Sequence, residues 1–239
     1  MDTPASRSAP APRTIVFDLD GTLADTGEDL VAAANAAFEE IGLGRPLDAQ
    51  ADRSVALRGG SAMLRLGFER ARGHWTEEEV RAQYDPLLAH YEAHIADRSR
   101  LYDGAEDAVR ALRDDGWRTA ICTNKPERLA EILMRALGAR ELFDALIGAD
   151  TLPVRKPDPA PYRAAVEAAG GDPARSLMIG DTETDRDTAR AAGVSCVLVT
   201  FGPEGGGVAR LEPDATFGAY GELGAIAARL VPERAELVP

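Results

Sequence analysis

From residue 102 onward, short apolar segments alternate with helix-length amphipathic ones, and this alternation restricts the chain to few folds. The strand-like segments are residues 118–122, 145–148, 176–179, 196–199 and 215–217, and the predicted helices are 105–115, 127–137, 160–169, 185–192 and 223–230. An earlier β-branched run, Thr14–Phe17, reads as a further buried strand. Strands alternating with helices in this way form βαβ units. The sequence therefore predicts an α/β fold with a Rossmann-like, doubly wound parallel sheet.

A second region lacks this alternation. Residues 28–41 are Ala-rich with helical periodicity, and residues 45–100 also read as helices, interrupted by glycines and without a convincing strand. Because this stretch follows the first strand, it predicts an all-helical cap domain inserted into the core. We expect the Rossmann-like catalytic core to comprise residues 1–24 and 101–239, and the helical cap domain to comprise residues 25–100.

Composition narrows the functional classes. The net charge of −13 disfavours binding to nucleic acid or to an anionic membrane surface, since both would repel the chain. No apolar stretch is long enough to span a bilayer, and the first twelve residues, which read as a disordered arm, lack the apolar segment of a secretory signal. Cys122 and Cys196 lie in strand-like runs and are expected to be buried free thiols. We expect a cytoplasmic protein, monomeric or homodimeric.

The first chemical motif is the acidic turn after Thr14–Phe17. Asp18 and Asp20 lie two residues apart at a strand end, and Gly21 allows the backbone to turn sharply. A carboxylate at such a position can attack phosphorus and form an acyl phosphate. A second carboxylate beside it can protonate the leaving oxygen and later activate water. The alternative is an Asp-rich turn that caps a helix.

Two further segments follow predicted strands. Thr123 and Asn124 come directly after the strand ending at Cys122 and could hold a phosphoryl oxygen, or could simply cap the next helix. Lys156, followed by Pro157, could supply fixed positive charge to the phosphoryl group, although most lysines lie in exposed loops.

The fourth segment, residues 180–185, reads Gly-Asp-Thr-Glu-Thr-Asp after a strand. Asp181 and Asp185 provide carboxylate oxygens, which suit a hard cation. The alternative is that they form a capping box or an acidic first turn at the start of the next helix. Ligands gather beyond the carboxyl ends of parallel strands, so all four segments can meet in one crevice. Clustered carboxylates need compensating cations. With one lysine and no His or Cys ligand, the cluster indicates Mg²⁺ rather than zinc.

These four motifs, DLDGT, TNK, KP and GDTETD, also resemble the signature motifs of the haloacid dehalogenase-like superfamily in order, spacing and strand context. The helical insert resembles the C1-type cap of that superfamily. The resemblance implies that Asp18 is the nucleophile and a Mg²⁺ ligand. It implies that Asp20 is the general acid and base, with its backbone carbonyl on the metal.

The resemblance extends to the remaining motifs. Thr123 and Lys156 would bind the phosphoryl group, with Asn124 as a neighbour in the substrate site. Asp181 would be a Mg²⁺ ligand, and Asp185 either a ligand or a partner that holds one in place. The cap would close over a small phosphorylated substrate and exclude water.

Within the superfamily, the chain is most similar to phosphoglycolate phosphatases. The supporting stretches are LYDG at 101–104, ICTNKP at 121–126, KPDPAP at 156–161 and VTFG at 199–202. This similarity implies a magnesium-dependent phosphatase acting on a small monoester such as phosphoglycolate. The cap also contains Arg53, Arg58 and Arg65. Arg58 adjoins Gly59 and Gly60 and is the favoured candidate contact for a substrate carboxylate or a second anion, and the alternative is a solvated arginine on a helix face.

Three other functions are compatible with such a fold. A hydrolytic dehalogenase would need neither Asp20 nor the metal motif, so the sequence argues against it. A phosphosugar mutase would keep the same core and return the phosphoryl group to a sugar. A catalytically silent binding protein would usually show a broken motif, and none is broken here.

Overall fold

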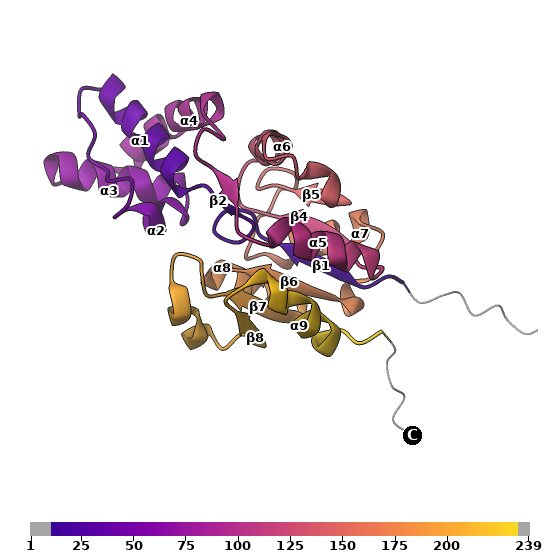
Figure 1. The fold of residues 1–239 in the computed structure, drawn as a ribbon. Coiled ribbons are helices and arrows are strands. Elements are labelled where there is room, and N and C mark those ends of the chain that lie inside the picture. The colour runs from indigo at the N-terminus through magenta and orange to yellow at the C-terminus, as the bar shows by residue number, and fades with distance from the viewer. Residues whose placement is uncertain (1–10, 234–239) are drawn as a thin grey trace, which may run out of the picture.

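The computed structural model describes residues 11–233, so most of the expected N-terminal arm lies outside the described residues. Within this range a parallel six-stranded sheet has the order β5-β4-β1-β6-β7-β8. The strands are β1 (Thr14–Phe17), β4 (Arg118–Cys122), β5 (Ala145–Ile147), β6 (Ser176–Gly180), β7 (Ser195–Val199) and β8 (Ala215–Phe217). The predicted α/β class and parallel sheet are therefore confirmed (Figure 1).

Helices cover both faces of the sheet. The helices of the core are α5 (Ala105–Asp114), α6 (Glu127–Ala136), α7 (Pro159–Ala168), α8 (Glu183–Ala192) and α9 (Leu223–Leu230). Ile15 and Phe17 of β1 belong to one apolar cluster with α5, α6 and α9, whereas Val16 belongs to another with α7 and α8. Both faces of β1 are thus buried, which explains why its sequence is continuously apolar instead of alternating.

The topology brings distant loops to one edge. β1 lies at the centre, with β4 on one side and β6 on the other, and all three run parallel. Their carboxyl ends therefore meet at the same edge of the sheet, where ligands of open α/β sheets bind. The loops after these three strands carry the first, second and fourth sequence motifs.

The all-helical cap lies beyond one end of the sheet (Figure 1). It consists of α1 (Gly27–Glu40), α2 (Arg53–Ala56), α3 (Gly60–Arg72) and α4 (Glu77–Ala93). Phe38 of α1 and Phe68 of α3 pack edge to face with ring centroids 5.0 Å apart, and Gly67 leaves room for the Phe38 ring. The capping box of Thr76 and Glu79 begins α4. The cap therefore has an apolar interior, which is continuous with the apolar cluster on one face of the sheet.

A short ribbon joins the cap to the core. β2 (Ala24–Asp25) and β3 (Arg100–Leu101) pair antiparallel where the chain enters and leaves the cap. The buried Asp25 carboxylate pairs with Arg53 of α2 and, at 3.2 Å, with Arg100 of β3. Asp29 accepts hydrogen bonds from the backbone N–H groups of Arg98 and Ser99. Two buried acids thus fix both connections of the cap.

Some local details differ from expectation. The glycine-rich segment at residues 202–207 lies between a predicted strand and the next and carries no helix prediction, but a 3₁₀ helix begins inside it and spans Gly205–Leu211. Its glycines follow the end of β7, and the apolar side chain of Val208 anchors the turn in the core. Further 3₁₀ helices span Arg140–Leu142, Pro173–Arg175 and Tyr220–Glu222. The two-residue strands β2 and β3 were not foreseen.

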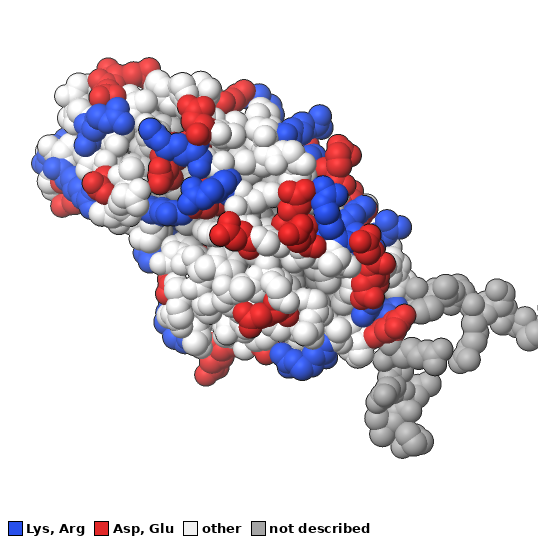
Figure 2. All heavy atoms as spheres, viewed as in Figure 1, with Lys and Arg blue, Asp and Glu red and all other residues white. Residues whose placement is uncertain are grey.

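Cys122 and Cys196 are buried free thiols, as expected. Among residues 11–233, none of the helices has both the length and the apolar character needed to cross a bilayer. On the face shown in Figure 2, acidic and basic side chains are interspersed over the cap and the core.

Candidate active site

The turn after β1 is held in shape by its own backbone. Gly21 has φ +82°, a conformation that favours glycine, and a Cβ atom there would collide with the Asp181 carboxylate. The Gly21 N–H donates to the Ala24 carbonyl at 2.9 Å, and the Thr22 carbonyl accepts a hydrogen bond from the Tyr220 hydroxyl at 2.7 Å. The loop therefore approaches the end of β6 closely enough to place both acidic motifs in one site.

Asp18 is held through one of its two carboxylate oxygens. Oδ1 accepts the backbone N–H of Leu19 at 2.7 Å and lies 2.9 Å from Lys156 Nζ. Oδ2 has no hydrogen bond from the described residues and is free to react. Burial raises the pKa of Asp18 to about 6, an effect that Lys156 opposes and that Asp185 reinforces.

Lys156 is a buried cation between two acids. Its side chain is 1% exposed, and Nζ lies 2.9 Å from Asp18 Oδ1 and 2.7 Å from Asp185 Oδ1. Although burial lowers the pKa of Lys156, the two carboxylates raise it above its ordinary value. Lys156 therefore remains charged, and the reading as an exposed loop lysine does not hold.

Asp181 and Asp185 complete the acidic cluster after β6. Ligand atoms of Asp18, Asp181 and Asp185 all lie within 4.8 Å of one another. Asp181 Oδ1 accepts from the Thr22 hydroxyl at 2.9 Å, but its Oδ2 is buried and finds no hydrogen-bond partner in the described part of the chain. Burial, with Asp185 and Asp18, raises the pKa of Asp181 well above its ordinary value. An unpaired buried carboxylate oxygen beside two other acids fits a divalent cation.

Asp185 differs from its neighbours because its oxygens are already occupied. Oδ1 faces Lys156, while Oδ2 accepts the Thr182 hydroxyl at 2.8 Å and the backbone N–H of Asp181 at 3.2 Å. These contacts orient the start of α8 and the residue that precedes it. The geometry therefore favours Asp185 as a partner that holds the other groups in place.

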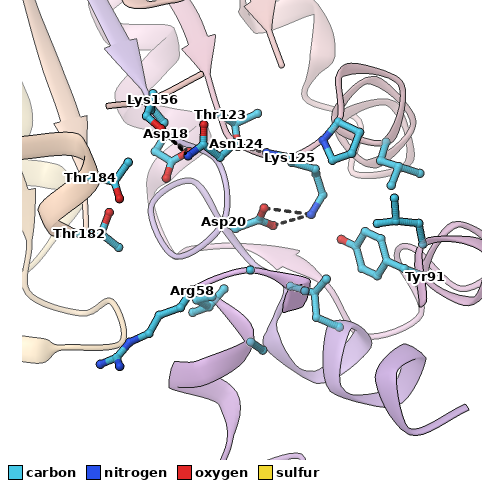
Figure 3. Close-up of a pocket in the computed structure, with 18 of the residues that line it drawn as sticks. Asp18, Asp20, Arg58, Tyr91, Thr123, Asn124, Lys125, Lys156, Thr182 and Thr184 are labelled. Carbon is cyan, nitrogen blue, oxygen red and sulfur yellow. Dashed lines mark hydrogen bonds and ion pairs between the residues drawn. The ribbon is translucent and has the colours of Figure 1, made fainter. Parts of the chain in front are cut away.

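Asp20 lies on the side of the site that faces the cap (Figure 3). Its carboxylate oxygens both lie 2.9 Å from Lys125 Nζ, and Oδ1 also accepts the Thr26 hydroxyl at 2.6 Å. Although burial lowers the pKa of Lys125, Asp20 and Tyr91 raise it above its ordinary value. We did not assign a role to Lys125 from the sequence, although it directly follows Asn124 in the second motif.

Thr123 and Asn124 lie where the sequence places them, after β4. Thr123 is buried, and its hydroxyl oxygen accepts the backbone N–H of Lys125 at 3.1 Å, which leaves the hydroxyl proton for a ligand. The Asn124 side-chain amide donates to the Lys156 carbonyl at 3.0 Å, so it also positions the Lys156 loop.

A cavity of about 430 Å³ lies between this cluster and the cap. Core residues that line it include Asp18, Asp20, Thr123, Asn124 and Lys156, and the cap contributes residues of α1, α3, α4 and the α2–α3 connection. Arg58 lines the cavity, but Figure 3 shows its guanidinium pointing away from Asp20 and Lys125. The cavity size suits a small ligand.

The histidines of the cap lie outside this cavity. His90 pairs with Glu40, and His94 with Asp97. These contacts agree with a structural or exposed role.

Comparison with known proteins gives a family. The family model for haloacid dehalogenase-like hydrolases matches residues 12–193, which include all four motifs. The chain belongs to the haloacid dehalogenase-like hydrolases. The match begins just before β1 and ends after α8, so it includes both the acidic cluster and the cap of this hydrolase.

Curated relatives of this hydrolase span nearly all of its length. A phosphoglycolate phosphatase of Cereibacter sphaeroides is 40% identical over 218 residues, covering 91% of this chain and 98% of the relative. One from Caulobacter vibrioides is 41% identical over 189 residues, covering 79% of each chain.

Solved structures agree with the fold. A "predicted phosphoglycolate phosphatase" from Haemophilus somnus superposes with a TM-score of 0.78 at 27% identity, covering 90% of this chain and 97% of the other. CbbY from Rhodobacter sphaeroides, solved in complex with phosphate, has a TM-score of 0.71 at 25% identity and covers 89% and 96% of the two chains.

Proposed function

We propose that this hydrolase is a Mg²⁺-dependent phosphatase that cleaves phosphoglycolate, or a closely similar monoester, through an aspartyl-phosphate on Asp18. That it hydrolyses phosphoric monoesters follows from its kinship with curated phosphoglycolate phosphatases over most of the chain. The metal, the covalent intermediate and the substrate are the proposal. The arrangement of Asp18, Asp20 and Lys156 around one cavity is the observation that carries it.

The first half-reaction transfers the phosphoryl group to the protein. Asp18 Oδ2, which is free of hydrogen bonds from the described residues, attacks phosphorus while Lys156 holds Oδ1 at 2.9 Å. The bond from phosphorus to the ester oxygen breaks, and that oxygen takes up a proton from Asp20 acting as the general acid. The alcohol leaves, and Asp18 carries the phosphoryl group.

The second half-reaction regenerates the carboxylate. Asp20, now ionised, accepts a proton from water as the water oxygen attacks phosphorus. The bond between phosphorus and the Asp18 oxygen breaks, and inorganic phosphate leaves. The Thr123 hydroxyl and the Lys156 ammonium are placed to stabilise the charge of the transferring phosphoryl oxygens.

Mg²⁺ fits the acidic cluster by the chemistry of its donors. Asp18, Asp181 and the backbone carbonyl of Asp20 would hold it, and the buried, unpartnered Oδ2 of Asp181 is the atom that most requires it. Asp185 would hold Lys156 and the Asp181 backbone in place. When bound, the cation neutralises the negative charge that phosphate brings into this acidic site.

A direct test measures phosphate release by the purified protein. We expect hydrolysis of phosphoglycolate in Mg²⁺ to exceed that of pyrophosphate, hexose phosphates and nucleotides, and to stop in EDTA. Phosphate release that survives EDTA would refute the metal dependence. Halide release from a haloacid in EDTA would instead favour a dehalogenase, and conversion of a sugar phosphate without phosphate release would favour a mutase.

The intermediate needs its own test. Acid quenching during turnover of ³²P-labelled substrate should leave label on the wild-type protein and none on Asp18→Asn. We expect Asp18→Asn to fold with the wild-type circular dichroism spectrum and to lose turnover. Undiminished hydrolysis by this variant would exclude the covalent mechanism.

Three further expectations stay predictions. They are the cap boundaries at residues 25–100, the cytoplasmic location, and the monomeric or homodimeric state. Limited proteolysis, fractionation and size-exclusion chromatography test them in turn.

A further inference from the structure

Two buried polar side chains, one from the core and one from the cap, meet in the wall of the cavity. Lys125 follows β4 and is 7% exposed, and Tyr91 of α4 is 1% exposed. Lys125 Nζ lies 4.4 Å from the centre of the Tyr91 ring, and both residues line the cavity. Figure 3 shows the Tyr91 hydroxyl directed toward Lys125 and Asp20.

Among residues 11–233 the Tyr91 hydroxyl has no hydrogen bond of good geometry, although its interaction with the nearby Lys125 ammonium raises the pKa of that lysine. A buried hydroxyl without a partner is costly, so such groups in a cavity wall commonly meet a ligand or an ordered water. Lys125 also retains bonding capacity. An ammonium group carries three protons, and Asp20 accepts through its two oxygens, which leaves one proton for the neighbouring Tyr91 hydroxyl or for a ligand.

The other cations of the cavity wall are less available. Lys156 is shared between Asp18 and Asp185, and Arg210 pairs with Glu204. The Arg58 guanidinium points away from Asp20. Among the described residues that line the cavity, Lys125 is therefore the cation best placed to meet the part of a substrate that lies beyond Asp20.

Beside Tyr84, the cap and α6 contribute a group of apolar side chains to the wall. They are Leu30, Ala56, Leu57, Leu87, Leu88 and Leu129. A hydroxyl-rich leaving group such as a sugar would lose hydrogen bonds to water against these side chains. A compact leaving group with one charged end would keep its polar contacts.

We propose that Lys125 and Tyr91 form the subsite that binds the carboxylate of the leaving group, and so select phosphate esters of 2-hydroxy acids. This rests on the proposed function, in which Asp20 meets the ester oxygen. Lys125 Nζ is 2.9 Å from both oxygens of Asp20, and in such an ester the carboxylate carbon is two bonds from the ester oxygen. A carboxylate there lies within reach of both donors and would bridge core and cap.

The test compares two substrates of the same size. Phosphoglycolate carries the carboxylate, and 2-hydroxyethyl phosphate replaces it with a neutral alcohol. The quantity measured is the ratio of their kcat/KM values in saturating Mg²⁺. We expect the wild-type ratio to exceed one strongly, and Lys125→Met to lower it by about tenfold to a hundredfold, because it removes a charge-assisted hydrogen bond.

Tyr91→Phe removes a single hydroxyl and should lower the ratio by about threefold to tenfold. Tyr162→Phe is the matched control, because Tyr162 is also a fully buried tyrosine, but its hydroxyl bonds Ser176 away from the cavity. It should leave the ratio unchanged. Should Lys125→Met not fold, Tyr91→Phe alone still decides, since it changes no volume in the wall.

The outcomes separate this inference from the proposed function. If Lys125 only holds Asp20, both substrates lose kcat equally and the ratio stays constant, which overturns the subsite. If Arg58→Met lowers the kcat/KM ratio and Lys125→Met does not, Arg58 binds the carboxylate, and this result also overturns the Lys125–Tyr91 subsite. A wild type that hydrolyses both esters equally refutes the subsite but keeps the phosphatase. Hydrolysis of neither ester refutes both.

Discussion

In the absence of metal, the folded protein should lose stability as the pH rises from about 4 to 6. The cause is Asp18, whose pKa is raised from 3.8 to about 6, mainly by burial. Between these two values the folded state keeps a proton that the unfolded state has released. The stabilising contribution is therefore complete below the lower value and is lost as the pH rises through the upper one.

The size of this loss follows from the shift. A change of one pKa unit corresponds to about 1.4 kcal/mol, so a shift from 3.8 to about 6 corresponds to roughly 3 kcal/mol. The raised pKa of Asp181 adds in the same direction. Bound Mg²⁺ should reverse the trend, because a cation requires ionised carboxylates and binds the folded state.

Urea denaturation at several pH values, in EDTA and in Mg²⁺, measures this linkage. The informative quantity is the difference in pH dependence between wild type and Asp18→Asn, because titrating groups distant from Asp18 cancel in it and only Asp18 and its acidic neighbours contribute. In EDTA, the free energy of unfolding of wild type should fall by about 3 kcal/mol over this pH range, and Asp18→Asn should lack that decrease. Mg²⁺ should also stabilise the variant less than it stabilises wild type. Identical pH profiles for the two proteins in EDTA would refute the reasoning.

Other predictions concern neighbouring groups. Lys156→Met leaves buried carboxylates unpaired and should cost on the order of 3–5 kcal/mol in urea denaturation; a cost near zero would contradict the ion pairs. Gly21→Ala, at φ +82° against the Asp181 carboxylate, should weaken Mg²⁺ binding about tenfold by calorimetry, whereas Gly224→Ala, with open space around it, should not. Tyr220→Phe loses its bond to the Thr22 carbonyl and should cost about 1 kcal/mol in thermal unfolding, and an unchanged midpoint would exclude that bond.

The sequence was most informative where strands end. The apolar run Thr14–Phe17 and the segment Arg118–Cys122 have the predicted bounds, because continuous burial on two faces leaves a continuous apolar signal. The acidic residues after β1 and β6 meet as expected, since parallel strands bring their carboxyl ends to one edge.

Contacts between the core and the cap were harder to foresee. Tyr91 reads as an ordinary apolar position of an amphipathic helix, and its approach to Lys125 depends on how the cap sits over the core. The ribbon of Ala24–Asp25 and Arg100–Leu101 is too short to leave a periodic pattern. Arg58 lines the cavity as its position suggests, but the direction of its side chain is set by packing that sequence does not encode locally.

That same ribbon has a consequence for how such enzymes diversify. Because β2 and β3 are hydrogen-bonded neighbours, the chain leaves the sheet domain and returns to it at a single place. The cost of bringing the ends of the insertion together grows only slowly with its length. A longer, shorter or foreign module could therefore be grafted at this junction with little penalty to the parent scaffold, while Asp18 and Lys156 remain undisturbed.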